Sequence, residues 1–342
     1  MKLRSRLRPG VQSRCRSLGG VQILGTGSYV PDAVITNDHL QHRFGRAPQS
    51  IARLTGIRER RHAFANQATS DLCCEAAKRC LEQTPIDSRD IDLVLLATVT
   101  PDQSFPSTAC LVQDRLGLNC AAVDLGAGCA GFMYALVTGA TYVASGASDL
   151  TLVIGGDCMS RVVDPQDVKT YPLFGDGAGA VLLARGRPDQ GLVRYRLGAK
   201  GSGAELLGRP ACGSRLPPTC AALAQGQHYL HMQGPGVFEW AAGILCDSIQ
   251  EVLRESNLRP EDIDLYVPHQ ANIKIINAAI DVLRIPRSRV FYNLERYGNT
   301  SAGSVPLALD EACAEGRIQP GNHIVLSGFG AGLAWGTAVW RW

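Results

Sequence analysis

The sequence predicts an α/β protein built from two halves that share one topology. Buried strand patterns alternate with helical patterns along the 342 residues, which is typical of mostly parallel sheets. Segments of the first half recur in the second half at a constant spacing. The helix expected at 130–144 is apolar around its whole circumference, so it should be buried on every side. Together these observations predict two sheets that enclose central helices, with further helices outside.

The recurrence has a spacing of 172 residues without a gap. It pairs residues 90–93 with 262–265, 129–131 with 301–303, and 153–156 with 325–328. In this alignment Ser301 stands where the first half has Cys129. His269 and Asn299 stand where the first half has only alanines, at 97 and 127. These differences between the halves indicate where chemistry was added.

The elements of the first half follow from their patterns. Residues 21–30 read as a strand and a turn, and a helix at 70–82 has Ser70 as its expected N-cap. Continuous apolar runs predict strands that are covered on both faces. The remaining elements are strand 91–98, helix 107–116, strand 122–125, helix 130–144 and strands 150–155 and 178–184.

The second half repeats this order. Its elements are helix 237–255, strand 263–268, helices 271–284 and 302–314, and strands 323–327 and 334–341. Residues 201–227 have no partner in the first half and are rich in Gly, Pro and small residues. We expect this segment to be a loop inserted near the mouth of the active site or a surface excursion.

The basic character of the chain is concentrated at its start. Residues 1–20 contain six Lys and Arg and no acid, and without them the formal charge of +3 becomes negative. We therefore expect a disordered basic extension at 1–20, an N-terminal half at 21–190 and a C-terminal half at 191–342. The rest of the chain has no excess of positive charge and so gives no general reason to expect nucleic-acid binding.

Composition excludes further classes of protein. No apolar run reaches the roughly 20 residues of a membrane helix. The twelve cysteines form no CxxC pair and no Cys/His spacing typical of zinc, so a disulfide scaffold and a metal site are not expected. Free thiols in this number predict a reducing, cytoplasmic compartment.

Cys129 is the candidate nucleophile. It lies in LGAGCAGF, between a short strand and the wholly apolar helix. The unpaired N–H groups of a helix start favour a thiolate and should lower the pKa of the thiol. The alternative is a packed cysteine on a buried helix, which is the usual role of a small thiol.

His269 and Asn299 are the candidate partners of the thiol. His269 follows the strand 263–268 in VPHQAN, at the sheet edge where α/β proteins bind ligands. Asn299 lies in YGNTSAGS, the second-half counterpart of the cysteine turn, so the two turns should meet near a pseudo-twofold axis. A structural histidine and a helix N-cap are the ordinary alternatives.

Two glycine-rich segments also stand out. GFGAGLAWG at 328–336 follows an apolar strand and can offer backbone N–H groups to an oxyanion. FGDGAGA at 174–180 suits a turn into a strand, with Asp176 ordering that turn. Neither has the spacing or the lysine of a nucleotide-binding loop.

Taken together, LGAGCAGF, LFGDGAGA, VPHQAN, YGNTSAGS and GFGAGLAWG, in their order and separations, resemble β-ketoacyl-acyl-carrier-protein synthase III of the thiolase superfamily. The resemblance runs from about Val21 to Trp342 and includes TGIRERR at 55–61. It implies a five-layered αβαβα fold and a Cys-His-Asn condensing enzyme.

The resemblance implies the roles of these residues. Cys129 would take an acyl group from acyl-CoA, and malonyl-acyl-carrier protein would then enter. His269 and Asn299 would donate hydrogen bonds to the malonyl thioester as CO2 leaves. The backbone N–H groups of Cys129 and Ala331 would form the oxyanion hole. No metal or redox cofactor is implied, and the reaction would initiate fatty-acid synthesis.

It also implies four further contacts. Phe105 would reach across a homodimer to close the partner's acyl pocket, which Phe329 would also line. Gln270 and Lys274 would form part of the surface on which the carrier protein docks. The Trp and Arg between which the family holds the CoA adenine are replaced here by Ser50 and Leu54, and a further Arg that contacts CoA is replaced by Val168.

Three other functions are compatible with single features. The first is a related condensing enzyme of a specialised-metabolite pathway, with another acyl donor or acceptor. The second is a cysteine hydrolase, which would need a base that activates water. The third is a non-catalytic binding module, against which the retained Cys129, His269 and Asn299 argue.

Overall fold

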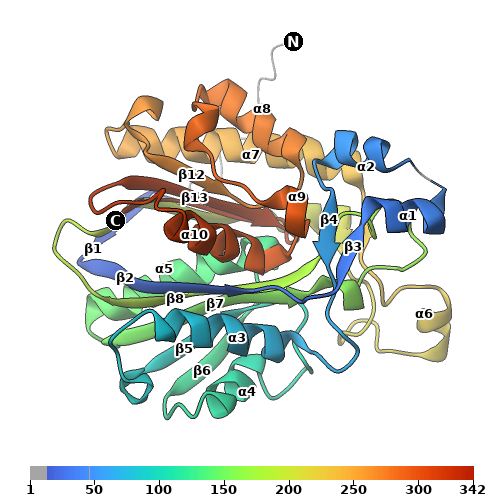
Figure 1. Cartoon of the computed structure of the whole chain (residues 1–342), viewed down its shortest axis with the longest axis horizontal. Coiled ribbons are helices and arrows are strands. Elements are labelled where there is room, and N and C mark those ends of the chain that lie inside the picture. The colour runs from blue at the N-terminus through green and yellow to red at the C-terminus, as the bar shows by residue number, and fades with distance from the viewer. Residues whose placement is uncertain (1–13, 46) are drawn as a thin grey trace.

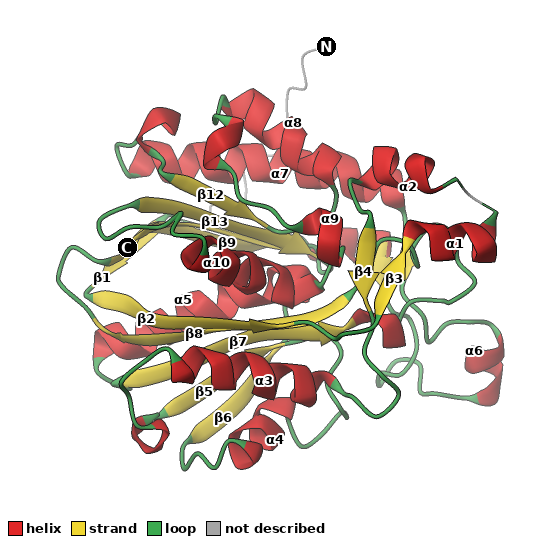
Figure 2. Ribbon diagram, viewed as in Figure 1, coloured by secondary structure: helices red, strands yellow, loops and turns green. Residues whose placement is uncertain are grey.

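Five layers of structure form the molecule, as the sequence predicts. The computed structural model describes residues 14–45 and 47–342. Two five-stranded sheets enclose the central helices α5 (Gly131–Ser145) and α10 (Ser304–Ala314), as Figures 1 and 2 show. Helices α3 (Thr69–Glu82) and α4 (Thr108–Arg115) cover one sheet from outside. Helices α7 (Gly234–Glu255) and α8 (Ile273–Leu283) cover the other.

The first sheet comes entirely from the N-terminal half. Its strand order is β2-β8-β7-β5-β6. The strands are β2 (Val21–Tyr29), β5 (Leu93–Ala97), β6 (Ala121–Leu125), β7 (Leu150–Cys158) and β8 (Asp176–Arg185). The pairs β5–β6 and β5–β7 are parallel, whereas β8 is antiparallel to both of its neighbours. The three inner strands β5, β7 and β8 are almost wholly buried, which explains their unbroken apolar runs.

The second sheet repeats this order as β9-β14-β13-β12 and carries β1 on its edge. Its strands are β1 (Arg16–Gly19), β9 (Gly191–Ala199), β12 (Leu265–Pro268), β13 (His323–Gly330) and β14 (Ala334–Arg341). Strand β9, which the sequence pattern did not reveal, is the counterpart of β2. The expected boundary at 190/191 falls between β8 and β9.

The first residues of the chain need a correction. Arg16–Gly19 are not a disordered leader, because they form β1, which pairs antiparallel with β9 of the C-terminal half. Cys15 packs against the core of that half. The rest of the expectation for 1–20 concerns residues 1–13, which lie outside the described residues.

Strand register corrects the spacing of the repeat. Leu93 pairs with Thr151, and its counterpart Leu265 pairs with Ile324, so the offset is 172 for β5 and 173 for β7. The helix starts agree with this shift, since α5 begins at Gly131 and α10 at Ser304. The second half therefore has one additional residue between β12 and α10.

This shift changes the counterpart of the cysteine. A Cβ added to Gly155 would meet the backbone of Ala302. A Cβ added to Gly328, the equivalent of Gly155, would lie 3.4 Å from the backbone oxygen of Cys129. Cys129 therefore corresponds to Ala302, not to Ser301. The gap-free alignment was wrong here because the similar letters Cys-Ala-Gly and Ser-Ala-Gly hide a one-residue insertion.

Smaller elements lie outside the two five-stranded sheets and the helices that cover them. They are β3 (Val34–Thr36), α1 (Asn37–Phe44), α2 (Pro48–Thr55), β4 (Glu59–Arg61), β10 (Leu207–Gly208), α6 (Cys220–Ala224), β11 (His231–Met232) and α9 (Leu294–Tyr297). The segment 201–227 forms β10 and α6, and β10 pairs with β11. Its residues Leu207, Gly208 and Arg209 line the central cavity, so the segment does reach the mouth of the site.

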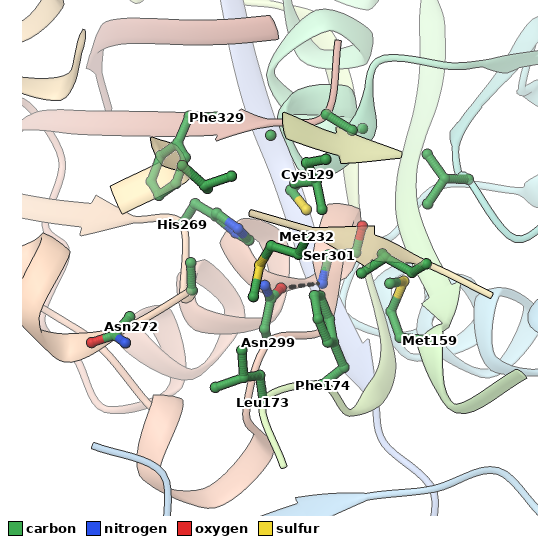
Figure 3. Close-up of a pocket in the computed structure, with 18 of the residues that line it drawn as sticks. Cys129, Met159, Leu173, Phe174, Met232, His269, Asn272, Asn299, Ser301 and Phe329 are labelled. Carbon is green, nitrogen blue, oxygen red and sulfur yellow. Dashed lines mark hydrogen bonds between the residues drawn. The ribbon is translucent and has the colours of Figure 1, made fainter. Parts of the chain in front are cut away.

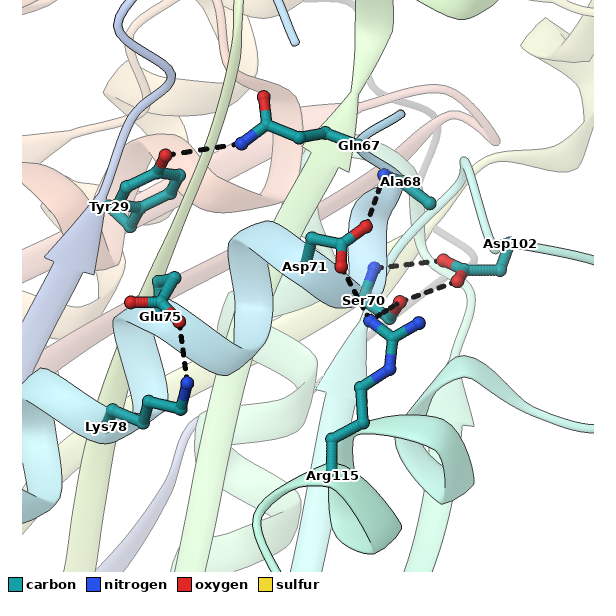
Figure 4. Close-up of polar contacts among 9 residues, drawn as sticks. All are labelled: Tyr29, Gln67, Ala68, Ser70, Asp71, Glu75, Lys78, Asp102 and Arg115. Atoms are coloured by element: carbon teal, nitrogen blue, oxygen red, sulfur yellow. Dashed lines mark hydrogen bonds and ion pairs between the residues drawn. The ribbon is translucent and has the colours of Figure 1, made fainter. Parts of the chain in front are cut away.

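Helix α3 begins differently from the sequence prediction. Its N-cap position is Ala68, not Ser70, because the Asp71 carboxylate accepts the Ala68 N–H at 2.6 Å. Ser70 donates its hydroxyl to Asp102 at 2.6 Å, and Arg115 forms an ion pair with Asp71, as Figure 4 shows. The network fixes the loop after β5 to two outer helices.

Three broader features concern the cysteines, membrane spans and metal ligands. All twelve cysteines are free. In the described ranges, no helix is both long and apolar enough to cross a membrane. Nor do residues 14–45 and 47–342 contain a cluster of His, Cys, Asp or Glu that could hold a metal ion.

Candidate active site

One cavity of about 440 Å³ brings the three candidate residues together. Cys129, His269 and Asn299 all line it, at the junction of the two halves (Figure 3). Most of the other lining residues are apolar, among them Leu230 and Ile275. A cavity with a few polar groups in an apolar wall is the usual form of a small-molecule site.

Burial controls the chemistry of Cys129. The residue lies in the 3-10 turn Gly128–Ala130 directly before α5, and it is 8% exposed. Burial raises the pKa of its thiol to about 12, whereas the helix start led us to expect a lowered pKa. The expectation was wrong because removing the thiolate from water outweighs the attraction of the helix N-terminus. In the free protein Cys129 is therefore a protonated thiol at neutral pH.

The backbone around Cys129 meets the glycine-rich turn after β13. A Cβ at Gly330 would lie 2.6 Å from the Cys129 nitrogen, and one at Gly128 would lie 2.8 Å from the Ala331 nitrogen. Only glycine permits this approach, and Gly128 also has a positive φ of 58°. Cys129 and Ala331 thus share one wall of the cavity, where two N–H groups can stabilise an oxyanion.

His269 follows directly after β12 and is 1% exposed. Its backbone N–H donates to Ser327 at 2.7 Å, and its ring meets Phe329 edge to face with centroids 5.0 Å apart. The ring Nδ1 lies 2.6 Å from the Ser304 hydroxyl. Burial lowers the pKa of His269 to about 3, so the imidazole is neutral. A neutral imidazole donates one hydrogen bond instead of forming an ion pair with a thiolate.

Asn299 is held by both halves. Its N–H donates to Leu173, and its carbonyl accepts from Gly175 at 3.0 Å. Its side-chain Oδ1 accepts the Ser301 N–H at 2.8 Å, as the dashed line in Figure 3 shows. Because the oxygen is occupied, the amide NH2 remains as the donor that Asn299 can offer to a ligand.

Buried polar side chains hold the loop at residues 172–175, which forms backbone hydrogen bonds with Asn299. The buried Arg60 of β4 donates to Pro172 at 2.7 Å and to Asn37, and burial lowers its pKa to about 10, so it remains a cation. Asp176 accepts hydrogen bonds from Ala63 at 2.7 Å and from Ser160, so its carboxylate ties the start of β8 to the loop after β4 and to the 3-10 turn Met159–Arg161.

The two expected docking residues differ in exposure. Gln270 is wholly buried, its amide donates to Pro268 at 2.7 Å, and its oxygen accepts from Asn293. It orders the loop after β12 and presents no surface to a carrier protein, so we withdraw it as a docking residue. Lys274 is exposed in the first turn of α8.

The two expected acyl-pocket residues also separate. Phe329 lines the cavity beside His269. Phe105 is 84% exposed and is not among the residues that line the cavity of its own chain. In a single chain, therefore, Phe105 does not contribute to the site.

Sequence reasoning missed Asp157, at the end of β7. This wholly buried carboxylate accepts four hydrogen bonds from residues 98–100 and one from the Ala302 N–H at 3.1 Å. It thereby joins the N-terminal sheet to the turn that follows Asn299. An acid at the end of an otherwise apolar strand was the available signal.

The fold and the cavity define a class of protein. A buried thiol, a neutral imidazole and an amide donor meet between two duplicated halves, with backbone N–H groups beside the sulfur. These features define an acyl-transferring condensing enzyme of the thiolase fold. Comparison with known families agrees with this class. Residues 123–201 match the model for 3-oxoacyl-[acyl-carrier-protein] synthase III, and residues 253–342 match the model for its C-terminal part.

Known relatives extend the match over nearly the whole chain. β-Ketoacyl-[acyl-carrier-protein] synthase III of Rhodopirellula baltica is 51% identical over 344 residues, covering 95% of this chain and 99% of that relative. The enzyme of Caldanaerobacter subterraneus is 45% identical and covers 94% of this chain and 97% of that relative. The chain therefore belongs to the β-ketoacyl-acyl-carrier-protein synthase III family.

Solved structures agree with this assignment. The synthase III structure from Thermus thermophilus has a TM-score of 0.87 and 41% identity, and the comparison covers 94% of this chain and 98% of that one. A priming β-ketosynthase of the R1128 polyketide pathway also has a TM-score of 0.87, at 31% identity and with 97% and 98% coverage.

Proposed function

We propose that this enzyme condenses a short acyl thioester with malonyl-acyl-carrier protein to give 3-oxoacyl-acyl-carrier protein, the first condensation of fatty-acid synthesis. The observation that carries the proposal is that Cys129, His269 and Asn299 line one largely apolar cavity. Family membership supports it, since the relatives are named for this activity.

The first half-reaction is acyl transfer to Cys129. The sulfur attacks the carbonyl of an acyl-CoA, and the resulting oxyanion accepts hydrogen bonds from the backbone N–H groups of Cys129 and Ala331. The C–S bond to CoA breaks, and the thiol proton leaves with the CoA thiolate. Because the pKa of Cys129 is about 12, attack and deprotonation are coupled and no stable thiolate precedes them.

The second half-reaction is decarboxylation and condensation. His269 and Asn299 donate hydrogen bonds to the thioester oxygen of the malonyl group. The C–C bond to the carboxylate breaks, CO2 leaves, and the electron pair forms an enolate that those two donors stabilise. The enolate carbon then attacks the acyl-Cys129 thioester, and the Cys129 thiolate leaves and takes up a proton.

The partners follow from the same proposal. The carrier protein would dock at the exposed Lys274, close to the cavity-lining Asn272 whose side chain caps α8. A homodimer would place the exposed Phe105 of one subunit at the acyl pocket of the other and cover exposed Val123 on the edge strand β6. Free cysteines suit a cytoplasmic location, and the proposed steps use no metal or cofactor.

Separating the two half-reactions tests the proposal. In His269→Ala, Cys129 should still be acylated by acyl-CoA, whereas malonyl decarboxylation should fall about 10²–10³-fold because one enolate donor is lost. Intact-protein mass spectrometry measures the first step, and release of labelled CO2 measures the second. A His269→Ala enzyme that decarboxylates normally would refute the role of the imidazole.

A second candidate function is condensation in a specialised-metabolite pathway with another acyl donor or acceptor. One similar structure, the R1128 priming β-ketosynthase, is named for a polyketide pathway. Condensation assays with a panel of acyl-CoA donors and two carrier proteins distinguish the pathways. Activity with acetyl-CoA and the fatty-acid carrier protein supports the initiating role, and activity only with other partners supports the alternative.

A further inference from the structure

We propose that Ser304 is a positioning residue that sets the tautomer of His269 and thereby makes the imidazole a hydrogen-bond donor. The inference rests on the proposed role of His269 in malonyl decarboxylation. Ser304 is the first residue of α10 and is 1% exposed. Its hydroxyl lies 2.6 Å from His269 Nδ1, within the range of a strong neutral hydrogen bond.

The tautomer matters because a neutral imidazole has one N–H and one lone pair. If Nδ1 carries the proton, Nε2 would present a lone pair to a substrate oxygen and repel it. If Nδ1 accepts a hydrogen bond, Nε2 carries the proton and can donate. Burial lowers the pKa of His269 to about 3, so the ring does not take up a second proton at neutral pH and must adopt one of the two neutral tautomers.

The contacts of Ser304 favour the second arrangement. Its oxygen already faces the Gln270 N–H at 3.5 Å, which occupies a lone pair. Among the residues that the structure describes, the hydroxyl hydrogen has no other acceptor than His269 Nδ1. The Ser304 hydroxyl therefore donates to Nδ1, and the proton of the ring lies on Nε2.

The N-terminal half contains the equivalent of the His269–Ser304 contact, but without polar side chains. Ala97 and Gly131 are the counterparts of His269 and Ser304 by strand register and helix start. A Cβ at Gly131 would lie 3.1 Å from the Ala97 Cβ, so the same strand end meets the same helix start there. Only the second half fills this contact with a hydroxyl and an imidazole, which indicates that the two side chains act as one unit.

The first test is Ser304→Ala. It should slow malonyl decarboxylation about 10–100-fold, less than loss of the donor itself because part of the imidazole keeps its proton on Nε2. Acylation of Cys129 should remain within about threefold of wild type. Ser304→Thr keeps the hydroxyl and should restore most of the decarboxylation rate.

Ser248→Ala is the matched control, because Ser248 is equally buried at 1% exposure and bonds to Thr337 at 2.8 Å, away from the lining of the cavity. It should cost similar thermal stability and leave both half-reactions near wild type. Equal slowing of both half-reactions in Ser304→Ala would show a merely structural role and overturn the inference.

The second test uses a double-mutant cycle. Glutamine at position 269 donates through an amide that has no tautomer, so Ser304→Ala in the His269→Gln background should change decarboxylation less than twofold. In addition, 15N spectra of histidine-labelled protein should show Nδ1 of His269 as an acceptor in wild type and a tautomer mixture in Ser304→Ala. The His269→Gln spectrum identifies the signal.

The outcomes separate the two proposals. A wild-type enzyme that does not decarboxylate malonyl thioesters refutes the proposed function. An active wild type with an unaffected Ser304→Ala variant refutes only the role of Ser304, as does an undiminished effect of Ser304→Ala in the His269→Gln background.

Discussion

The two strand-to-helix contacts that face each other across the centre of the molecule have the same geometry and different contents. In the N-terminal half, Ala97 meets Gly131, and neither residue carries a polar side chain. In the C-terminal half, His269 meets Ser304 through a 2.6 Å hydrogen bond. The first contact lies beside the turn that carries Cys129, and the second holds an imidazole that can donate a hydrogen bond. Under the proposed mechanism, the duplicated fold divides the nucleophile and the hydrogen-bond donors between its two copies.

Burial acts on both sides of this comparison in the same way. It raises the pKa of Cys129 to about 12 and lowers the pKa of His269 to about 3. Both groups are therefore neutral at rest, because a charge in this cavity would lose its hydration. A site of neutral groups stabilises charge only where it develops on the substrate, which is what enolate formation requires.

The strongest way to break the comparison is Cys129→Ser, which leaves both turns with hydroxyls only. Acyl transfer to residue 129 should fall at least about 10³-fold, because a buried alcohol is a far poorer nucleophile than a thiol. Intact-protein mass after incubation with acyl-CoA measures this loss. The matched variant Ser301→Ala, in the opposite turn, should still acylate Cys129. A comparable loss in Ser301→Ala would place the nucleophile's machinery in both turns and contradict the division of labour.

A smaller effect is expected where the second half approaches the thiol. A methyl group at Gly330 would lie 2.6 Å from the Cys129 nitrogen, so Gly330→Ala must displace the backbone of Cys129, whose N–H is part of the proposed oxyanion hole. We expect acylation to slow by about 10–100-fold and the free energy of unfolding to fall by about 1–3 kcal/mol. Stopped-flow acylation and denaturant unfolding measure the two effects. Gly126→Ala is the control, since a Cβ there meets nothing within 4 Å; equal effects of the two substitutions would contradict the proposed wall.

The smallest effect, taken per pH unit, concerns acid stability on the donor side. The pKa of His269 is about 3 in the folded chain and about 6.5 when unfolded, so the unfolded state takes up the proton first. The contribution of the buried neutral ring is complete above about pH 6.5 and is lost as the pH falls toward 3. Relative to His269→Gln, wild type should lose up to about 1.4 kcal/mol of unfolding free energy per pH unit within that window. Urea unfolding at several pH values measures the difference, and parallel curves would contradict burial of a neutral imidazole.

Much of the fold could be predicted from periodicity alone. The buried runs of β5, β7 and β8 were recognised because a strand covered on both faces leaves no polar face. Helix α5 was recognised from its apolar composition, although it is not buried on every side, because Thr141, Tyr142 and Ser145 near its C-terminus are exposed. Strand β9 was missed because only its first two residues are buried and the rest are half-exposed or exposed. Strand β1 was missed because an edge strand of exposed residues has the composition of a leader.

The chain by itself indicated that Cys129, His269 and Asn299 belong to one site, because Cys129 and His269 follow strand patterns, Asn299 lies in the repeat of the cysteine turn, and their motifs together resemble one family. Only the tertiary structure decided their ionisation, since a pKa depends on how much water surrounds a group and the sequence does not show burial. It also decided that Gln270 is internal, that the register shifts by one residue, and that a serine stands behind the imidazole. These are contacts between segments far apart in the chain, and they exist only once the two halves have packed together.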